Sequence, residues 1–375
     1  MPTASLYDDF KKSAYFPSLN GIRAICALVV IKEHAGWKID RAPQMFEWGF
    51  LGVDMFFVIS GFLIVTLLLR ERDRQGNIDL GQFYVRRTLR IFPIYYLLVG
   101  LLFVVAVASY GHSTKTWDLY KWSFPIFLLY LQDLVPISLG LLFHTWSLSM
   151  EEQFYLIWPS VERFFSRRLI VPTLLVLILL CQLVNFGYLA GALTAIYGPS
   201  GPLRPIFMIT FTPILLGVLG AHALHDPAMG RFIARLLGSR WMPPLLLGAA
   251  VLVCELSTQL QGVTRLAVHC LFCLLLMAMV INPRGIFSRA LQSRVMAYLG
   301  SISYGIYLYH TSILWAVGRL CESRGFALLP FTMFAIAAPL AVGVAAVSFK
   351  YFETPIMNIR HRRAAAPAAT AEQAA

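Results

Sequence analysis

Apolar runs of membrane-spanning length recur along the whole chain, and no other feature constrains its fold so strongly. A helix needs about 20 apolar residues to cross a hydrocarbon core about 30 Å thick. Inside lipid the backbone amides must be satisfied within the protein, which leaves helices and closed barrels as spanning structures. Charged residues form only 13% of the sequence, against roughly 25% in a soluble domain. The sequence therefore predicts an all-α polytopic membrane protein.

The apolar runs predict about ten transmembrane helices within the 375 residues. The candidate spans are 18–36, 48–69, 91–109, 147–165, 169–190, 203–223, 241–258, 265–282, 298–316 and 328–350. A further stretch, 124–140, is interrupted by Gln132, Asp133 and Pro136. Non-helical backbone at membrane depth is stable only when buried in protein or lining a wet cavity. We therefore expect 124–140 to be re-entrant or interfacial, and 110–146 to roof a cavity on the outer side.

The net charge of +12 comes mainly from arginines that lie between the apolar runs. Cytoplasmic loops of membrane proteins carry an excess of Lys and Arg. With a cytoplasmic N-terminus and no crossing at 124–140, most basic residues fall on one side; a crossing there would place arginine clusters on both sides. We therefore expect both termini to be cytoplasmic, with Lys115 and Lys121 outside. A nucleic-acid partner is not expected, because it would need basic residues clustered on a polar fold.

The two ends of the sequence differ from its apolar middle. Residues 1–17 are charged and have no early apolar stretch, so they are expected to be a cytoplasmic segment and not a cleavable signal peptide. Residues 18–355 form the expected membrane domain. The Ala-rich tail, 356–375, is expected to be cytoplasmic and disordered.

Cys270 and Cys273 form a C-x-x-C pattern directly after His269, which raises the question of a metal site. Such a site would need a third and a fourth ligand at recognisable spacing, and the sequence offers none. We therefore expect these cysteines to be small core residues, and no metal is expected.

The first span carries ionisable residues at membrane depth, where they are costly and commonly functional. Arg23 and His34 lie three helical turns apart on one face, separated by roughly 16 Å along the axis. This spacing places a cation deep in the membrane and a titratable base nearer the outer surface. The alternative is that Arg23 pairs structurally and His34 reaches the interface.

Asp54 lies one turn into the second span, near the outer surface. It is a candidate catalytic carboxylate, and the alternative is a cap for the N-terminus of that helix. Gly52 and Gly61 flank it and are expected to permit close helix packing.

Three arginines, Arg86, Arg87 and Arg90, lie in the expected inner loop just before the third span. Guanidinium groups bind phosphate oxygens in bidentate fashion, so these residues are candidates for a phosphorylated cytosolic ligand. The alternatives are a purely topological role or contact with lipid headgroups.

His144 and Glu151 open the fourth span on the outer side. Glu151 is a candidate catalytic carboxylate, although carboxylates are also favoured in the first turn of a helix by its dipole.

The ninth span carries a polar stripe, since Ser303, Tyr307 and His310 follow at i, i+4 and i+7. This stripe is a candidate substrate-binding face, and the alternative is a ladder of hydrogen bonds between helices.

Six stretches of this sequence, in this order, carry a resemblance to a known family. They are SLNGIRAICALVVIKEHAGW (18–37), GVDMFFVISGFLI (52–64), FYVRRTLRIFP (83–93), HTWSLSMEEQFYLIWP (144–159), LGSISYGIYLYH (299–310) and FKYFETP (349–355). Together they resemble the acyltransferase-3 family of integral membrane O-acyltransferases. The family's Arg-x10-His pattern falls on Arg23 and His34, and its Arg-x-x-Arg pattern on Arg87 and Arg90.

The resemblance implies an enzyme of the bacterial inner membrane that transfers an acyl group, usually acetyl, from cytosolic acyl-CoA to a hydroxyl group. Acceptors in the family are often envelope glycans or lipid-linked sugars, and sometimes small molecules. Some members carry a fused extracytoplasmic esterase-like domain, which is not expected here because the sequence ends soon after its last apolar run.

A mechanism follows from the charge pattern and the resemblance together. We expect CoA phosphates to dock on the inner arginines, and the pantetheine arm to pass Arg23 toward His34. His34 would act either as the base or as an acylated nucleophile, with Glu151 or Asp54 orienting its ring. The expected substrate-binding residues are Arg23, Arg86, Arg87, Arg90, Ser303, Tyr307 and His310. The alternative function is a transporter or flippase of an envelope precursor.

Overall fold

The computed structural model describes residues 3–39, 42–110, 115–134, 140–189, 191–192, 195 and 211–359. All regular secondary structure in these residues is helical, which confirms the predicted all-α class. Parts of the expected 110–146 roof, the first part of the 203–223 span and the tail from residue 360 onward lie outside the described residues.

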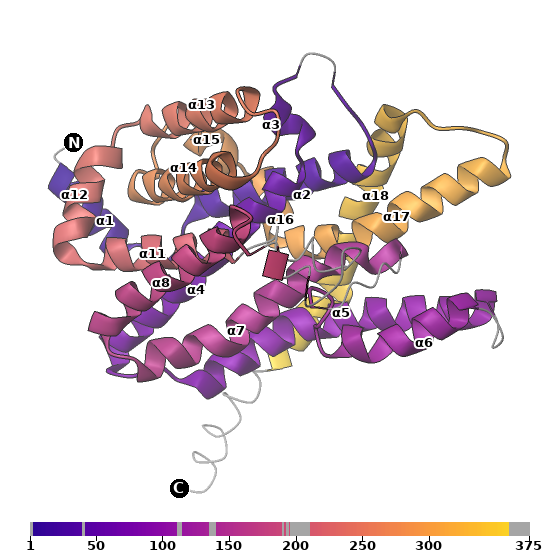
Figure 1. Ribbon diagram of the computed structural model, residues 1–375, viewed down its shortest axis with the longest axis horizontal. Coiled ribbons are helices and arrows are strands. Elements are labelled where there is room, and N and C mark those ends of the chain that lie inside the picture. Colours follow the sequence, from indigo (N-terminus) through magenta and orange to yellow (C-terminus); the bar gives the residue numbers. More distant parts are fainter. Residues whose placement is uncertain are drawn as a thin grey trace, which may run out of the picture.

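The helices follow the apolar runs, and prolines stand in the first turn of several of them, where their missing amide costs nothing. Their order is visible in Figure 1. They are α1 (Thr3–Lys12), α2 (Pro17–His34), α3 (Gln44–Glu47), α4 (Phe50–Gln75), α5 (Leu80–Tyr110), α6 (Lys115–Leu128), α7 (Trp146–Phe164), α8 (Arg167–Asn185), α11 (Thr212–His225), α12 (Pro227–Leu237), α13 (Met242–Glu255), α14 (Gly262–Ile281), α15 (Ser288–Leu291), α16 (Arg294–Ser301), α17 (Ser303–Ser323) and α18 (Pro330–Ser348). A 3₁₀ turn, Gly140–Thr145, precedes α7, and a π-helical turn, Phe349–Glu353, follows α18.

Among the described residues, 5 helices are long and apolar enough to cross a membrane, or up to 7 if each of two bent pairs counts as one span. The bent pairs join the N-terminal helix to α2 and α12 to α13, each at 80°. These helices support an integral membrane protein, while the count of about ten spans stays a prediction. Helices α7 and α17 are not among these apolar helices, because polar residues interrupt their sequences. Two of these polar residues, Ser147 and Tyr307, meet inside the molecule with their hydroxyl oxygens 2.6 Å apart.

Several boundaries differ from those expected. Helix α5 begins at Leu80, so Arg86, Arg87 and Arg90 lie on a helix and not in a loop. The ninth predicted span is broken at Ile302, between α16 and α17. The stretch 124–140 is helical in α6 up to Leu128 and then turns; α6 packs along α5.

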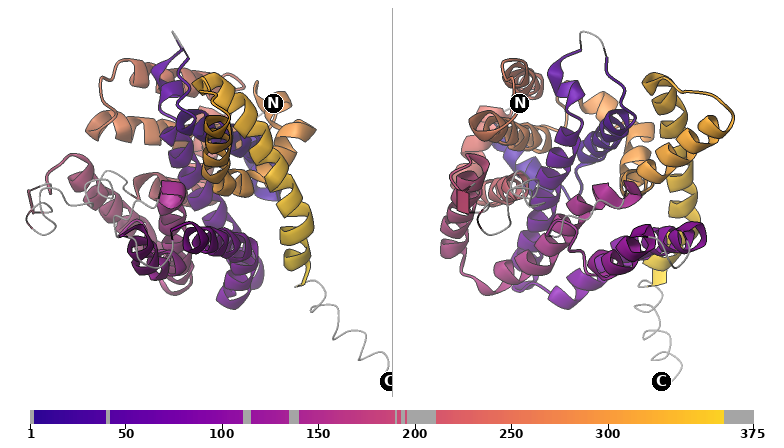
Figure 2. Two further views of the ribbon diagram at one scale, coloured as in Figure 1. Left: turned by 90° about the vertical axis from the view of Figure 1, so that its right-hand side faces the viewer. Right: turned by 45° about the vertical axis from the view of Figure 1, so that its right-hand side comes forward.

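Helix α4 forms the centre of the bundle, since 78% of its apolar 18-residue stretch is buried. It crosses α11 at very short range, because a Cβ added at Gly61 would overlap the carbonyl oxygen of Ile214. A Cβ at Gly52 would meet the carbonyl oxygen of Cys26 on α2 at 2.8 Å. The packing role predicted for both glycines is therefore confirmed. Figure 2 shows α2 and α4 in the middle of the molecule and α18 along one side.

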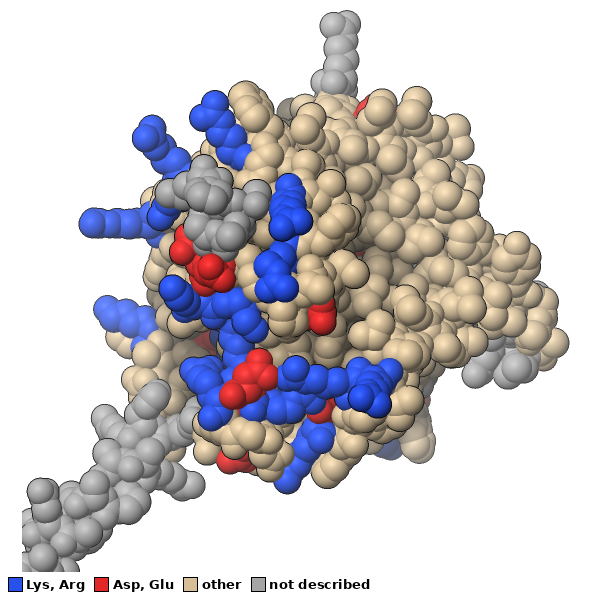
Figure 3. All heavy atoms as spheres, turned by 90° about the vertical axis from the view of Figure 1, so that its left-hand side faces the viewer, with Lys and Arg blue, Asp and Glu red and all other residues tan. Residues whose placement is uncertain are grey.

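Lys and Arg side chains gather over one part of the face drawn in Figure 3, beside a large surface that carries almost no charge. This separation of basic residues from uncharged surface is what the topology prediction requires. Which side is cytoplasmic stays a prediction.

Candidate active site

A cavity of about 160 Å³ lies among α2, α4, α5, α7 and α17. Helix α4 supplies an apolar wall from Val53 to Leu67, a length of roughly 21 Å at 1.5 Å per residue. The other helices supply most of the polar lining: Arg23, Arg87, Arg90, Ser147, Glu151, Glu152, Tyr155, Ser303, Tyr304 and Tyr307, together with Ser60 of α4. The cavity therefore combines an apolar wall along α4 with a lining of arginines, glutamates and hydroxyl groups.

Three half-buried arginines face this cavity, Arg23 from α2 and Arg87 and Arg90 from α5. The Arg87 guanidinium lies over the Tyr155 ring, 5.1 Å from its centroid. Arg86 differs from its neighbours, since it pairs with Glu71 of α4 at 3.3 Å and does not line the cavity. The three arginines therefore do not form a single group as expected.

Glu151 lies opposite these arginines, on the first turns of α7. Its carboxylate accepts hydrogen bonds from the Tyr155 hydroxyl at 2.8 Å and from the Ser60 hydroxyl. It also interacts electrostatically with Arg23. Glu151 is thus placed to balance the charge of the arginines, and its hydrogen-bond partners do not include His34.

A cluster of three histidines lies beside the cavity. His34, at the end of α2, contacts His310 of α17, with Nδ1 of His34 2.7 Å from Nε2 of His310. Nδ1 of His310 lies 2.5 Å from the carbonyl oxygen of Tyr307. The ring of His144 packs edge-on against that of His310, with 4.9 Å between centroids. His310 and His144 are fully buried, whereas His34 is half-buried.

Tyr307 and Ser147 connect the cavity to the histidine cluster, because both line the cavity and contact the cluster. The Tyr307 hydroxyl donates to the carbonyl oxygen of His144 at 3.0 Å and lies 2.6 Å from the Ser147 hydroxyl. The polar stripe predicted on the ninth span therefore faces the site. Phe143 lies on the other flank of His34, edge-on at 5.0 Å between centroids, and is 42% exposed.

Asp54 occupies a separate buried site against α14. It accepts a hydrogen bond from Nε2 of His269 at 2.9 Å and pairs with Arg265 at 3.4 Å. Neither Asp54 nor Glu151 therefore contacts His34; the partner of His34 is His310. Cys273, beside this site, donates to the carbonyl oxygen of Leu216 and is buried.

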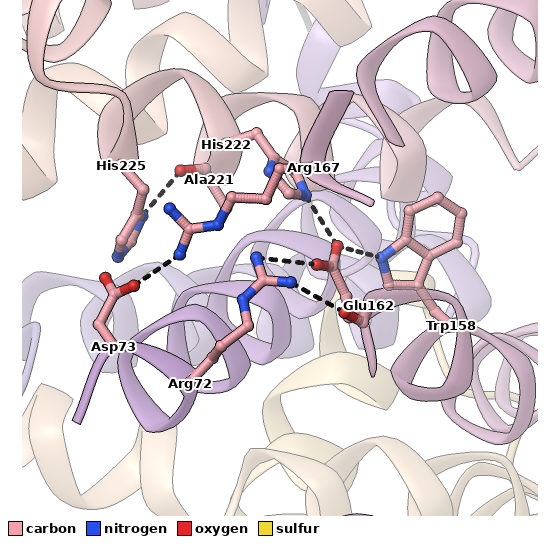
Figure 4. Close-up of polar contacts among 8 residues, drawn as sticks. All are labelled: Arg72, Asp73, Trp158, Glu162, Arg167, Ala221, His222 and His225. Atoms are coloured by element: carbon pink, nitrogen blue, oxygen red, sulfur yellow. Dashed lines mark hydrogen bonds and ion pairs between the residues drawn. The ribbon is translucent and has the colours of Figure 1, made fainter. Parts of the chain in front are cut away.

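A second polar cluster joins the C-terminal ends of α4, α7 and α11 (Figure 4). Glu162 is fully buried and contacts Nε2 of His222 at 2.7 Å and Nε1 of Trp158 at 3.0 Å. Arg72 donates to the backbone carbonyl of Glu162 at 2.9 Å and lies 3.9 Å from its carboxylate. None of these residues lines the cavity described above.

For some residues that line the cavity, the sequence alone gives little indication of that position. Tyr155 lies at i+4 from Glu151 on the same helix, a spacing that brings their side chains together. Ser60 and Ser147 look like ordinary polar residues of a span, and only the packing of α4, α7 and α17 shows that they face the site.

The apolar helices and the internal polar cavity define an integral membrane protein with a buried site. Comparison with known proteins narrows this class, since the family described as an acyltransferase domain, acyltransferase-3, matches residues 16–350. The chain therefore belongs to the acyltransferase-3 family.

The relatives described here are 27–28% identical to this chain over the aligned residues. A protein of Staphylococcus aureus (strain COL) is 28% identical over 375 residues, 93% of this chain and 58% of the relative. The peptidoglycan O-acetyltransferase OatA of Listeria monocytogenes is 28% identical over 91% of this chain and 56% of its own length. The O-acetyltransferase OatA of Staphylococcus aureus (strain NCTC 8325 / PS 47) is 27% identical over 91% of this chain and 57% of its own. The chain thus spans less than two thirds of these relatives, and no solved structure matches it.

Proposed function

We propose that this chain transfers an acyl group, most simply acetyl, from acyl-CoA on the cytoplasmic side to a hydroxyl group of an envelope glycan on the outer side. The observation that carries the proposal is the cavity, which joins three arginines to the histidine cluster through Tyr307 and Ser147. The family and the O-acetyltransferase names of the relatives support the same chemistry.

The residues of the cavity fit a CoA donor. Arg87 and Arg90 supply guanidinium groups for phosphate oxygens. The apolar wall of α4, roughly 21 Å long, suits the extended pantetheine arm. Arg23 also lines the cavity, from α2, and we assign it to the acyl end of the donor. We assign donor binding to these three arginines and not to Arg86, whose charge is already paired with Glu71.

The reaction needs a base that takes a proton from the acceptor hydroxyl. In our proposal the His34 imidazole accepts this proton while the hydroxyl oxygen attacks the thioester carbonyl carbon. The C–S bond then breaks, and the departing CoA thiolate takes the proton back from His34. The products are an O-acyl ester and CoA with a free thiol, so atoms and charge balance.

The proposed topology brings the two substrates in from opposite sides. About ten spans, with both termini on the cytoplasmic side of a bacterial inner membrane, place α5 arginines toward the donor and the end of α2 toward the acceptor. Labelling of single cysteines in intact cells tests this arrangement. Position 121 should react from outside and position 72 should not.

The experiment that tests the function uses purified protein in lipid nanodiscs with labelled acetyl-CoA and a soluble peptidoglycan fragment as the acceptor. Wild-type protein should transfer label to the acceptor hydroxyl, and His34→Ala should not, while both bind acetyl-CoA equally. His225→Gln is the matched control, because the one ring hydrogen bond of His225 found among the described residues goes to Ala221 on its own helix, and His225 lies outside the site. Glycan movement across vesicles without CoA, together with no acyl transfer, would instead identify a transporter.

A further inference from the structure

We infer that His310 is a positioning residue that fixes the tautomer of His34 and leaves Nε2 of His34 as the atom that accepts the proton. The inference rests on the proposed acyl transfer, since it specifies how the base of that reaction is held. It also changes the role expected for His310, from binding substrate to orienting another residue.

The contact between the two rings has the geometry of a hydrogen bond in the plane of both rings. Their planes differ by 14°, and their centroids are 5.0 Å apart. This separation is close to the 2.7 Å between Nδ1 of His34 and Nε2 of His310 plus the two ring radii. The nitrogen atoms therefore face each other edge to edge, along the direction in which an imidazole N–H and a lone pair point.

The direction of this hydrogen bond follows from the other end of His310. Nδ1 of His310 lies 2.5 Å from the carbonyl oxygen of Tyr307, which can only accept. Nδ1 of His310 therefore carries the proton, and in the neutral ring Nε2 has the lone pair. Nδ1 of His34 must then donate to Nε2 of His310, because two lone pairs could not approach to 2.7 Å.

This chain of hydrogen bonds leaves a free lone pair on Nε2 of His34. No hydrogen bond to that atom is found among the described residues, so it is available to a substrate hydroxyl. His144 does not compete for it, since its ring nitrogens lie beside the Leu308 carbonyl at 3.2 Å and the Thr311 hydroxyl at 3.1 Å. The backbone carbonyl of Tyr307 thus acts through His310 as the carboxylate of a triad acts on its histidine.

The orienting group is neutral, and this distinguishes the pair from a carboxylate–histidine pair. The two carboxylates considered for the role have other partners, Ser60 and Tyr155 for Glu151, and Arg265 and His269 for Asp54. A neutral partner gives the imidazolium less stabilisation than a carboxylate would. His34 should therefore hold its proton only briefly and return it to the thiolate in the same catalytic event.

Two substitutions at His310 separate positioning from simple packing. In His310→Gln the amide oxygen accepts from Nδ1 of His34 and the amide nitrogen donates to Tyr307, so kcat should stay within about tenfold of wild type. In His310→Leu neither bond forms, and kcat should fall by about 10²-fold or more. KM for acetyl-CoA should remain the same in both, because the arginines that bind the donor are untouched.

A spectroscopic measurement on wild-type protein avoids any effect of substitution on folding. Histidines are labelled with ¹⁵N, and the His34 signals are identified by their loss in His34→Gln. Nδ1 of His34 should be protonated and Nε2 unprotonated, which is the minor tautomer of free histidine. His225→Gln serves as the control for assignment by loss of signal.

The outcomes for the two proposals are distinct. A protonated Nε2 on neutral His34, or equal kcat in His310→Gln and His310→Leu, would overturn the positioning role while the acyl-transfer function stands. Full activity in His34→Gln would instead remove the base on which both proposals depend. Rescue by Gln but not by Leu, with the Nδ1-protonated tautomer, is the result that we expect.

Discussion

Helix α7 carries two acidic sites, buried Glu162 and half-buried Glu151, that differ in what surrounds them. At its C-terminal end, Glu162 is enclosed by Trp158, His222 and Arg72 from three helices, with no contribution to the cavity. Near its N-terminal end, Glu151 touches the hydroxyls of Ser60 and Tyr155 and faces a cavity that also holds arginines. Polar groups that satisfy one another stabilise the bundle, whereas polar groups left facing a cavity are available to a ligand.

The first prediction tests the site around Glu162, which other side chains enclose. Glu162→Ala would remove the carboxylate that contacts His222 and Trp158 and lies 3.9 Å from Arg72, and breaking such a buried pair typically costs about 3–5 kcal/mol. We therefore expect a clear drop in the thermal midpoint of unfolding in detergent, with little change in kcat per folded molecule. An unchanged midpoint would show that this cluster does not join the three helices.

The matched change at Glu151, which faces the cavity, should have the opposite effect: it should lower activity and leave stability nearly unchanged. Glu151→Gln keeps the shape of the side chain but removes the charge that faces Arg23. Acyl transfer should fall at least about tenfold, while the free energy of unfolding should change by less than about 1 kcal/mol, since the neighbouring groups reach a cavity. If Glu151→Gln lowers the unfolding midpoint as much as Glu162→Ala does, the distinction between the two sites is wrong.

The arginines of α5 offer a finer comparison between neighbours. Arg87→Ala removes a guanidinium that faces the cavity, and a hydrogen bond to a charged group contributes about 1.5–3 kcal/mol. The dissociation constant for acyl-CoA should therefore rise about tenfold to hundredfold, as isothermal titration of the purified protein would measure. An unchanged dissociation constant in the double Arg87→Ala, Arg90→Ala variant would reject donor binding by these residues.

Arg86→Ala is the control for Arg87→Ala, and its expected effect on acyl-CoA binding is the smallest of these predictions. The Arg86 side chain is 37% exposed, and its guanidinium pairs with Glu71 outside the cavity. Exposed ion pairs contribute about 0–1 kcal/mol, so acyl-CoA affinity should change by less than about fivefold. A loss equal to that of Arg87→Ala would mean that all three arginines bind the donor after all.

The sequence predicted the helical class, and six of the expected site residues line the cavity: Arg23, Arg87, Arg90, Glu151, Ser303 and Tyr307. Helix periodicity alone places Ser303 and Tyr307 on one face of α17. It could not tell Arg86 from Arg87, since that choice depends on the rotation of α5 and on Glu71, which lies on α4. The partner of His34 was also beyond reach, because His310 is 276 positions away and the contact depends on how α2 meets α17. Asp54 was assigned to the site on depth alone, and α14 supplies its actual partners.

The most direct test of the account is a single-turnover experiment on lipid-reconstituted protein with bound, labelled acetyl-CoA and a hydroxyl acceptor. Wild-type protein should transfer the label, and His34→Gln should bind acetyl-CoA equally but transfer it about 10²–10⁴-fold more slowly, as expected on removal of a general base. Label should not accumulate on the wild-type protein when the acceptor is left out, because the role that we propose for His34 is that of a base and not of a nucleophile. Retention of a tenth of the wild-type rate in His34→Gln, or an acylated His34 in the wild type, would contradict the account.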